Sequence, residues 1–264
     1  MKYYSPSTLA AYFELQNSLS ESQTAVLAGG TDLMPRYERD RPLPDHLIDL
    51  KKLPLSAITV NEDQIEIGAL STIQAVHDHS LIQEEFLGLY QAAHDFAGAQ
   101  IRHRGTIGGN ICNASPAGDL LPPLYAFKAE LKLQSPQDER ILPIHEFILG
   151  PGQTALQDSE LLVSIILKRN QMSSEFQKVG LRQSMAIAVV SLAFVWGENV
   201  EDLTIAIGAA APTVVSLNSI NPAKLLNQID LIDMAIAPID DIRATAKYRS
   251  AVIKNLIREF LGQH

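Results

Sequence analysis

The fold is decided by the stretch Gly105-Thr106-Ile107-Gly108-Gly109-Asn110-Ile111-Cys112-Asn113-Ala114-Ser115-Pro116, with Asp119 three residues beyond it. The stretch lies in a segment, residues 98–118, that holds five of the chain's 15 glycines. Paired glycines let a backbone turn sharply and approach a ligand closely, and successive N–H groups in such a turn bind anions. Taken alone, the stretch also fits a long loop made of ordinary turn residues.

A second diglycine segment lies nearer the N-terminus. Val26-Leu27-Ala28 ends a predicted strand, residues 23–28, and runs directly into Gly29-Gly30-Thr31-Asp32-Leu33. By itself this segment more often indicates a strand-ending turn in which Thr31 or Asp32 caps the next helix. Two such segments are more specific than either one, because two loops can grip the diphosphate and the long body of a dinucleotide from different sides.

Charge and motif content narrow the ligand class. The chain has 264 residues and a net charge of −9, which disfavours nucleic acid and anionic membrane surfaces as partners. In so acidic a chain, backbone N–H groups can hold a pyrophosphate without a basic patch. The sequence contains neither G-x-G-x-x-G nor G-x-x-x-x-G-K-[ST], so it predicts neither a Rossmann site nor a P-loop.

The single cysteine, Cys112, excludes an intrachain disulfide, a four-thiolate iron–sulfur cluster and a cysteine-rich zinc site. We interpret it as a small buried side chain rather than a nucleophile, since no base lies near it in sequence. The N-terminus shows no apolar signal-peptide segment, and the longest nearly apolar run, residues 185–196, is too short to span a bilayer as a helix. We therefore expect a cytoplasmic protein with no membrane partner.

The predicted elements are mixed in order, which favours an α+β fold over a regular series of βαβ units. Residues 57–69 predict a hairpin that turns at Asn61-Glu62-Asp63. A polar stretch at residues 168–174 predicts a domain boundary. Helices are predicted over residues 84–97, 119–129 and 240–261, and strands over residues 176–181, 187–196 and 203–210.

Other candidate ligand-binding residues are supported by weaker sequence patterns. Arg102-His103-Arg104 could attract an anion, although a solvated turn is the more common case. His77 and His79 do not share a helical face, so we interpret them as surface residues. Lys178 and Arg182 could each face either an anion or solvent. The sequence predicts no catalytic acid–base pair and no set of metal ligands.

Together the motifs give the chain a family resemblance. It resembles the FAD-binding medium subunits of the molybdenum hydroxylases, of the xanthine dehydrogenase and carbon monoxide dehydrogenase type. The resemblance rests on residues 28–33, on residues 101–116 with Asp119, and on Arg243-Ala244-Thr245-Ala246-Lys247-Tyr248-Arg249. It implies an α+β fold like that of the vanillyl-alcohol oxidase flavoproteins. FAD-binding subdomains would occupy residues 1–55 and 56–168, and a small antiparallel sheet with helices would form a C-terminal domain, residues 172–264.

The resemblance also implies where FAD is held. The two diglycine loops would hold the pyrophosphate and its surroundings, and Asp119 would lie near the ribityl or ribose hydroxyls. Phe96 would lie near the adenine, Leu161 or Leu162 would line the adenine or ring pocket, and Lys178 would lie close to the isoalloxazine. The implied cofactor-binding residues are Val26, Leu27, Ala28, Gly29, Gly30, Thr31, Asp32, Leu33, Phe96, Gly105, Thr106, Ile107, Gly108, Gly109, Asn110, Asp119, Leu161, Leu162 and Lys178.

The function implied by the resemblance is electron transfer within a hetero-oligomer. The chain, with non-covalent FAD, would take electrons from a small [2Fe-2S] subunit served by a large molybdopterin-binding subunit, and would pass them to NAD or another acceptor. Two alternatives remain: a stand-alone flavin oxidoreductase of the same fold, and a non-catalytic assembly protein. The lone Cys112 disfavours relatives that carry an extra cluster in this subunit. Met185 stands where some relatives have an acidic residue close to the flavin.

Overall fold

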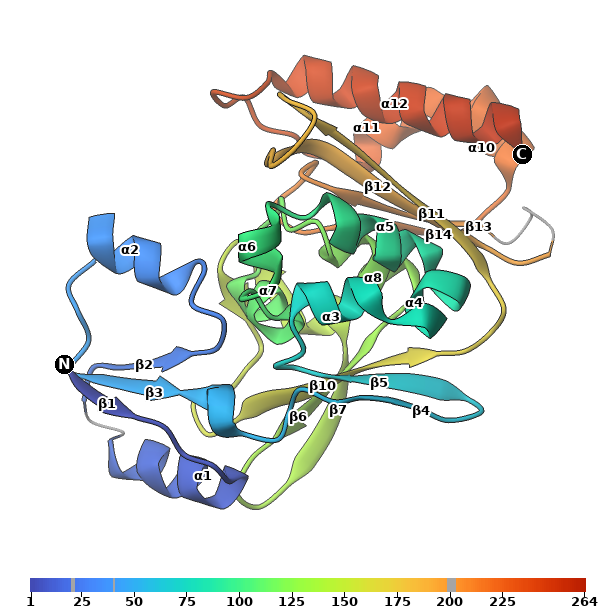
Figure 1. Ribbon diagram of the computed structural model, residues 1–264. Helices are drawn as coiled ribbons and strands as arrows, with labels where there is room; N and C mark the ends of the chain where they lie inside the picture. The colour runs from blue at the N-terminus through green and yellow to red at the C-terminus, as the bar shows by residue number, and fades with distance from the viewer. Residues whose placement is uncertain (20–21, 40, 199–202) are drawn as a thin grey trace.

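The computed structural model describes residues 1–19, 22–39, 41–198 and 203–264. Within these ranges the chain forms three sheets of three or more strands and a two-stranded one, with helices between and around them (Figure 1). This arrangement confirms the predicted α+β class. None of the helices in these ranges is long and apolar enough to cross a membrane.

The N-terminal sheet is parallel, in the order β1-β3-β2. Parallel neighbours need crossover connections, and helices α1 and α2 provide them. Tyr12 and Phe13 of α1 are buried against Ile48 of β3. Because β2 ends at Leu27, the first diglycine bend emerges from the end of this sheet. The elements are β1 (Lys2–Tyr4), α1 (Leu9–Ser18), β2 (Thr24–Leu27), α2 (Leu33–Arg39), β3 (His46–Asp49) and η1 (Leu50–Lys52).

The central sheet is antiparallel, in the order β4-β5-β10-β6-β7. The predicted hairpin is confirmed as β4 and β5, and the Asn61 side chain accepts hydrogen bonds from the N–H groups of Asp63 and Gln64 in its turn. The strands are β4 (Ile58–Val60), β5 (Gln64–Gly68), β6 (Glu130–Gln134), β7 (Glu139–Pro143) and β10 (Leu161–Lys168), beside the small pair β8 (Ile148–Gly150) and β9 (Gln153–Thr154).

The helices of this central region differ from the prediction in two places, and in one of them the helix predicted over residues 119–129 spans only Leu121–Ala126. The single helix predicted over residues 84–97 is wrong: it is divided at Phe86, whose φ of −128° leaves the helical range. At this break the Phe86 side chain is buried edge-on against Phe127, with 5.0 Å between the ring centroids. The helices are α3 (Ile73–Asp78), α4 (Ser80–Glu85), α5 (Leu87–Asp95), α6 (Ala99–Arg102), α7 (Ile107–Asn113), α8 (Leu121–Ala126) and α9 (Ile144–Phe147).

The C-terminal sheet is antiparallel, in the order β11-β12-β13-β14, and helices cover both of its faces (Figure 1). Leu192 and Phe194 of β12 pack with Ile257 and Phe260 of α12, whereas Ala193 packs toward α5 and α8. Two buried faces explain why residues 187–196 are almost continuously apolar. The elements are β11 (Ser173–Gly180), β12 (Ala188–Trp196), β13 (Leu203–Gly208), β14 (Val215–Ile220), α10 (Pro222–Asn227), η3 (Ile229–Leu231), α11 (Ile232–Ala235) and α12 (Ala246–Gln263).

The segment before α12 is a turn, so the helix predicted from residue 240 begins later, at Ala246. Asp241 causes the delay, because its carboxylate accepts hydrogen bonds from the N–H groups of Arg243 and Ala244. Asp241 also pairs with Arg249, a fully buried arginine that donates to the carbonyls at the start of β12 and just after β13. The segment 243–249, quoted above for its resemblance, therefore ties α12 to the sheet.

Candidate functional site

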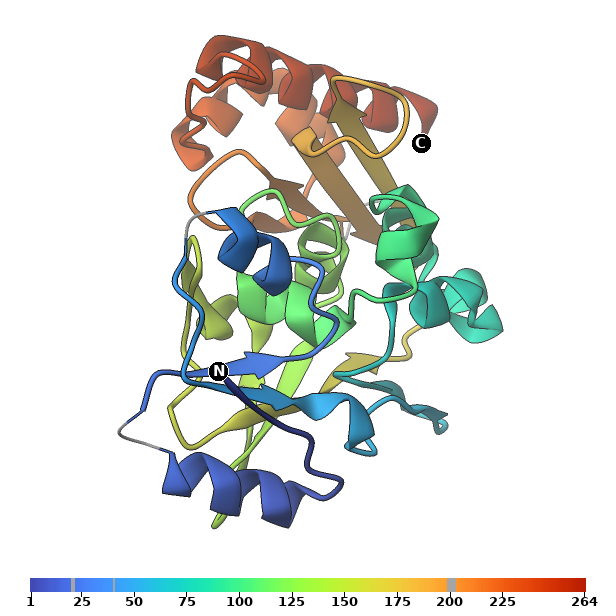
Figure 2. The ribbon, with the colours of Figure 1, turned by 60° about the vertical axis from the view of Figure 1, so that its left-hand side comes forward.

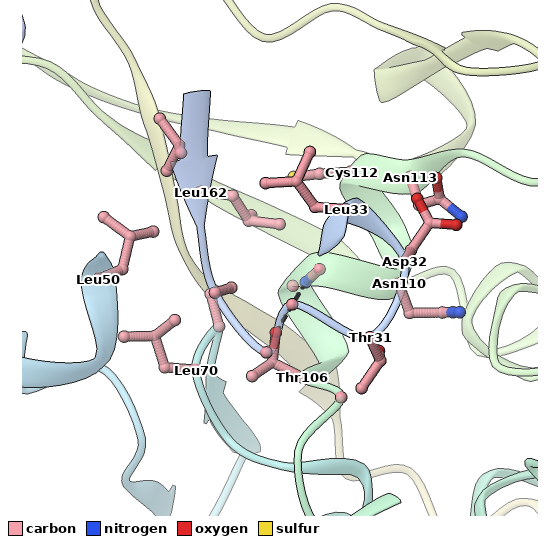
Figure 3. A pocket seen from close by; sticks show the side chains of 18 of the residues that line it. Thr31, Asp32, Leu33, Leu50, Leu70, Thr106, Asn110, Cys112, Asn113 and Leu162 are labelled. Carbon is pink, nitrogen blue, oxygen red and sulfur yellow. Dashed lines mark hydrogen bonds between the residues drawn. The ribbon is translucent and has the colours of Figure 1, made fainter. Parts of the chain in front are cut away.

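A cavity of about 690 Å³ lies between the N-terminal sheet and α7, and both diglycine bends line it (Figure 3). Its volume is within the range of small-molecule pockets. Apolar side chains from Leu50, Leu70 and Leu162 form one wall, and Thr31, Asp32 and Asn110 form another (Figure 3). The cavity is therefore apolar on one side and polar on the other, as a site for a long amphipathic ligand would be.

The two bends touch each other. A Cβ on Gly29 would lie 2.1 Å from the Arg104 carbonyl oxygen and 2.9 Å from the Gly105 Cα, so only glycine fits at position 29. Gly30 has a φ of +79°, a conformation that glycine adopts without strain. A Cβ on Gly108 would lie 2.7 Å from the Ala69 side chain, which lets α7 pack closely against the end of β5. The glycines thus bring two segments far apart in sequence into direct contact.

The first bend presents backbone donors. Within the described ranges, the N–H groups of Gly30, Thr31 and Asp32 donate to no protein acceptor. Orphan N–H groups at such a bend and helix start form a site for an anion. The first bend therefore offers backbone N–H donors that no described protein group uses.

The second bend differs from the expectation. Its N–H groups already have protein partners: that of Ile107 donates to Ser71, that of Gly108 to Ala69, and that of Gly109 to the Thr106 hydroxyl at 3.1 Å. The Thr106 side chain caps α7, so capping and packing use the amides that were expected to bind the ligand. The second bend contributes close approach and side chains rather than free amides.

Two buried oxygens of sequence-predicted site residues lack hydrogen-bond partners in the described part of the chain. One is Oδ1 of Asn110, on the cavity wall, and the other is Oδ1 of Asp119. A buried polar atom without a partner is costly unless a ligand or water satisfies it. The two oxygens are acceptors, so they suit a ligand that carries hydroxyl groups.

Asp119 and Lys178 form a buried ion pair where the central region meets the C-terminal sheet. Lys178 Nζ lies 2.6 Å from Asp119 Oδ2, and it also donates to the Asp95 carbonyl at 3.1 Å. Burial raises the pKa of Asp119 to about 6, although the neighbouring Lys178 charge opposes the rise. Lys178 therefore faces an anion, the Asp119 carboxylate, rather than solvent.

The structure brings most of the sequence-predicted residues to one cavity. Leu27 and Ile107 belong to the bends, but their side chains are buried in the core rather than lining the cavity. Asp119 and Lys178 lie outside the cavity lining. The predicted residues that line it are Val26, Ala28, Gly29, Gly30, Thr31, Asp32, Leu33, Phe96, Gly105, Thr106, Gly108, Gly109, Asn110, Leu161 and Leu162.

Some lining residues lay outside the sequence prediction. Arg36, Tyr12 and Gln16 line the cavity, and no motif pointed to them. Cys112 also lines it, and burial raises the pKa of its thiol to about 12, so it stays protonated near neutral pH. His77 is not a simple surface residue, because its ring stacks on Tyr90 at 4.8 Å.

Two family sequence models match the chain. The one described as the FAD binding domain in molybdopterin dehydrogenase matches residues 1–167. The chain belongs to this family. Residues 175–264 match the CO dehydrogenase flavoprotein C-terminal domain. These matches confirm the resemblance that was based on the diglycine segments and on residues 243–249.

Relatives of the molybdopterin dehydrogenase family span the whole chain. The xanthine dehydrogenase FAD-binding subunit of Escherichia coli O157:H7 is 29% identical, over 99% of this chain and 94% of that protein. The carbon monoxide dehydrogenase medium chain of Hydrogenophaga pseudoflava is 28% identical, over 99% and 96% respectively. A solved structure of carbon monoxide dehydrogenase from that organism matches with a TM-score of 0.89 and 25% identity, covering 98% of this chain and 95% of that one. The chain is an oxidoreductase component of this type.

Proposed function

We propose that the cavity binds FAD without a covalent bond, with the diphosphate against the first diglycine bend. The observation that carries the proposal is the row of unengaged N–H groups at Gly30, Thr31 and Asp32, beside a cavity of about 690 Å³. The unpartnered oxygens of Asn110 and Asp119 fit the hydroxyl-rich middle of the same cofactor. Family membership supports the choice of FAD over other dinucleotides.

The remaining contacts follow from the same placement. Thr106, held as the cap of α7, and the glycines at positions 105, 108 and 109 would let the cofactor approach the second bend. Phe96 would contact the adenine end, and Leu161 or Leu162 would contact the cofactor from the start of β10. Asp119 and Lys178 would meet the cofactor where it passes toward the C-terminal domain. The proposed division is 1–55, 56–168 and 172–264.

We propose further that the chain is the electron-transfer subunit of a cytoplasmic molybdenum hydroxylase. Its relatives are subunits of xanthine and carbon monoxide dehydrogenases, which supports a hetero-oligomer. The proposed partners are a large molybdopterin-binding chain and a small [2Fe-2S] chain. The subunit would take electrons from the iron–sulfur partner and pass them to NAD or another acceptor.

FAD and the protein would have separate roles. Bound FAD supplies the redox chemistry, and the protein supplies position and electrostatics. The first bend holds the anionic centre of the cofactor with amide dipoles, which suits a chain of net charge −9. The buried Lys178 pairs with the Asp119 carboxylate where the central region meets the C-terminal sheet.

Flavin content tests the binding step. The purified full chain is incubated with excess FAD, desalted and measured by flavin absorbance, before and after acid precipitation. We expect about one FAD per chain that is released into the supernatant by acid. A chain that retains no flavin would contradict the proposal, and flavin that stays with the precipitate would contradict non-covalent binding.

Co-expression tests the partner step. The chain is tagged and co-expressed with a large molybdopterin-binding chain and a small [2Fe-2S] chain from the same genome. We expect all three to co-purify in equal amounts, and NAD to reoxidise the reduced complex. A chain that purifies alone, yet oxidises a substrate with its own FAD, would favour the stand-alone alternative.

A further inference from the structure

Arg36 stands out among the residues around the cavity. Of the described residues that line it, Arg36 is the one lysine, arginine or histidine, whereas Asp32, Asp158 and Glu160 contribute carboxylates. A dianionic diphosphate entering such a cavity meets an unfavourable field. A cationic side chain that neutralises a carboxylate near the first bend therefore favours binding of the diphosphate.

Arg36 connects the two bends. Its Nη2 lies 2.7 Å from Asp32 Oδ2, in the first bend, and 2.7 Å from Asn113 Oδ1, at the end of the helix that starts at the second bend. Figure 3 shows the side chains of Asp32 and Asn113 next to each other at one side of the cavity. One guanidinium nitrogen thus joins both segments.

Helix α2 makes little other polar side-chain contact with the rest of the described chain. None of its seven residues is buried. Among the described residues, the bond from Arg36 to Asn113 is the one hydrogen bond or ion pair that links an α2 side chain to a more distant element. Since α2 follows the first bend directly, the position of that bend relative to α7 is set partly by this contact.

We propose that Arg36 is a positioning residue for the diphosphate: it neutralises Asp32 and holds the first bend against α7, so that the amides of Gly30, Thr31 and Asp32 face the ligand. The inference rests on the FAD binding proposed above. Arg36 lies outside both diglycine motifs, yet its charge offsets that of Asp32 in the first bend. We call this contact with Asp32 and Asn113 the Arg36 clasp.

The test measures FAD affinity by quenching of flavin fluorescence in the full chain. We expect Arg36→Met to weaken FAD binding by about tenfold or more, the scale of losing hydrogen bonds to a charged group. Arg39→Met is the matched control, because Arg39 lies on the same short helix but is exposed and, among the described residues, bonds only to the Pro35 carbonyl of that helix. We expect it to change the affinity by less than about twofold.

Two further measurements separate positioning from a general loss of structure. The melting temperature without FAD should stay within about 2 °C of the parent for Arg36→Met, since its side chain is part of a partly exposed pair. The double variant with Asn113→Ala should bind FAD no more weakly than the weaker single variant, because both remove the same contact.

Three outcomes would contradict the proposed positioning role of Arg36. They are FAD binding by Arg36→Met within twofold of the parent, losses that add in the double variant, or a large fall in the melting temperature of the apo protein. Failure of the parent chain itself to bind FAD would instead overturn the proposed function, so the two failures are distinguishable.

Discussion

No side chain fits at Gly29, because the Arg104 carbonyl oxygen would lie 2.1 Å from its Cβ. The residue therefore does two things: it ends β2 in a sharp bend, and it lets that bend touch the segment before α7. The adjacent N–H groups of Gly30, Thr31 and Asp32 have no protein acceptor among the described residues. The contact between the two bends therefore requires glycine at position 29.

Replacing Gly29 with alanine tests this reading. The added methyl must push the two bends apart, so we expect FAD affinity to fall roughly 10- to 100-fold, the range for overpacking a close contact. Fluorescence titration of the full chain measures the loss. Gly262→Ala is the control, because no atom of the described residues lies within 4 Å of a Cβ there and the residue is in α12. Equal FAD binding by Gly29→Ala and the parent would contradict the contact.

At the scale of elements, α12 carries the stability of the C-terminal domain. Phe260 stacks on Phe194 with ring centroids 4.0 Å apart, and Trp196 meets Phe260 edge-on at 5.1 Å. Arg249 adds polar contacts from the same helix to the ends of β12 and β13. The helix and the sheet are therefore one unit, joined by aromatic packing and a buried arginine.

Phe260→Ala should destabilise this unit by about 3–5 kcal/mol, the usual loss for a buried phenylalanine. Trp196 is the single tryptophan of the chain and touches Phe260, so its fluorescence during urea unfolding reports on the domain directly. The exposed Glu259, one residue earlier, provides a control, and Glu259→Ala should change stability by less than about 0.5 kcal/mol. A loss below about 1 kcal/mol for Phe260→Ala would show that α12 is not anchored in this way.

Elements with local causes were predictable from the sequence, and those with distant causes were not. The hairpin at residues 57–69 follows from alternation and a turn residue, Asn61, that bonds its own neighbours. At the break, Phe86 packs on Phe127, which is remote in sequence and which no local pattern indicates. At the site, paired glycines indicated the bends, but the amide partners at Ala69 and Ser71 come from another segment, and no pattern revealed them.

At the scale of the whole molecule, the N-terminal sheet and α12 lie at opposite ends, with the central region between them (Figure 1, Figure 2). Strand β11 joins the C-terminal sheet to this centre: Ser174 accepts a hydrogen bond from Gly88, and Phe176 donates one to Gln91. The Asp119–Lys178 pair lies on the same seam. The seam is therefore partly ionic and should respond to pH.

The sign of that response follows from Asp119. Its folded pKa of about 6 lies above the ordinary value of 3.8, so the folded state holds the proton more tightly and stability falls as pH rises between these values. Lys178 opposes the rise in the pKa of Asp119. In Lys178→Met that cation is gone, so the pKa of Asp119 rises further and the free energy of unfolding keeps falling at higher pH. We expect the variant to lose about 3 kcal/mol near pH 8, or about 6–12 °C in melting temperature, and clearly less near pH 5.

Thermal melting at the two pH values, without FAD, measures the effect. Lys168→Met is the control, because Lys168 is exposed and pairs loosely with Glu130 at 3.5 Å, so it should change little at either pH. Equal losses for Lys178→Met at both pH values would mean that the charge of Asp119 does not change between pH 5 and pH 8, which would contradict a folded pKa of about 6.

The most direct test of the account is a structure of the full chain with bound FAD. The account predicts that diphosphate oxygens lie within about 3.2 Å of backbone nitrogens at residues 30–32, with the second bend in van der Waals contact beside them. A diphosphate held anywhere else, or by the amides of residues 107–109 after their present bonds have broken, would contradict it.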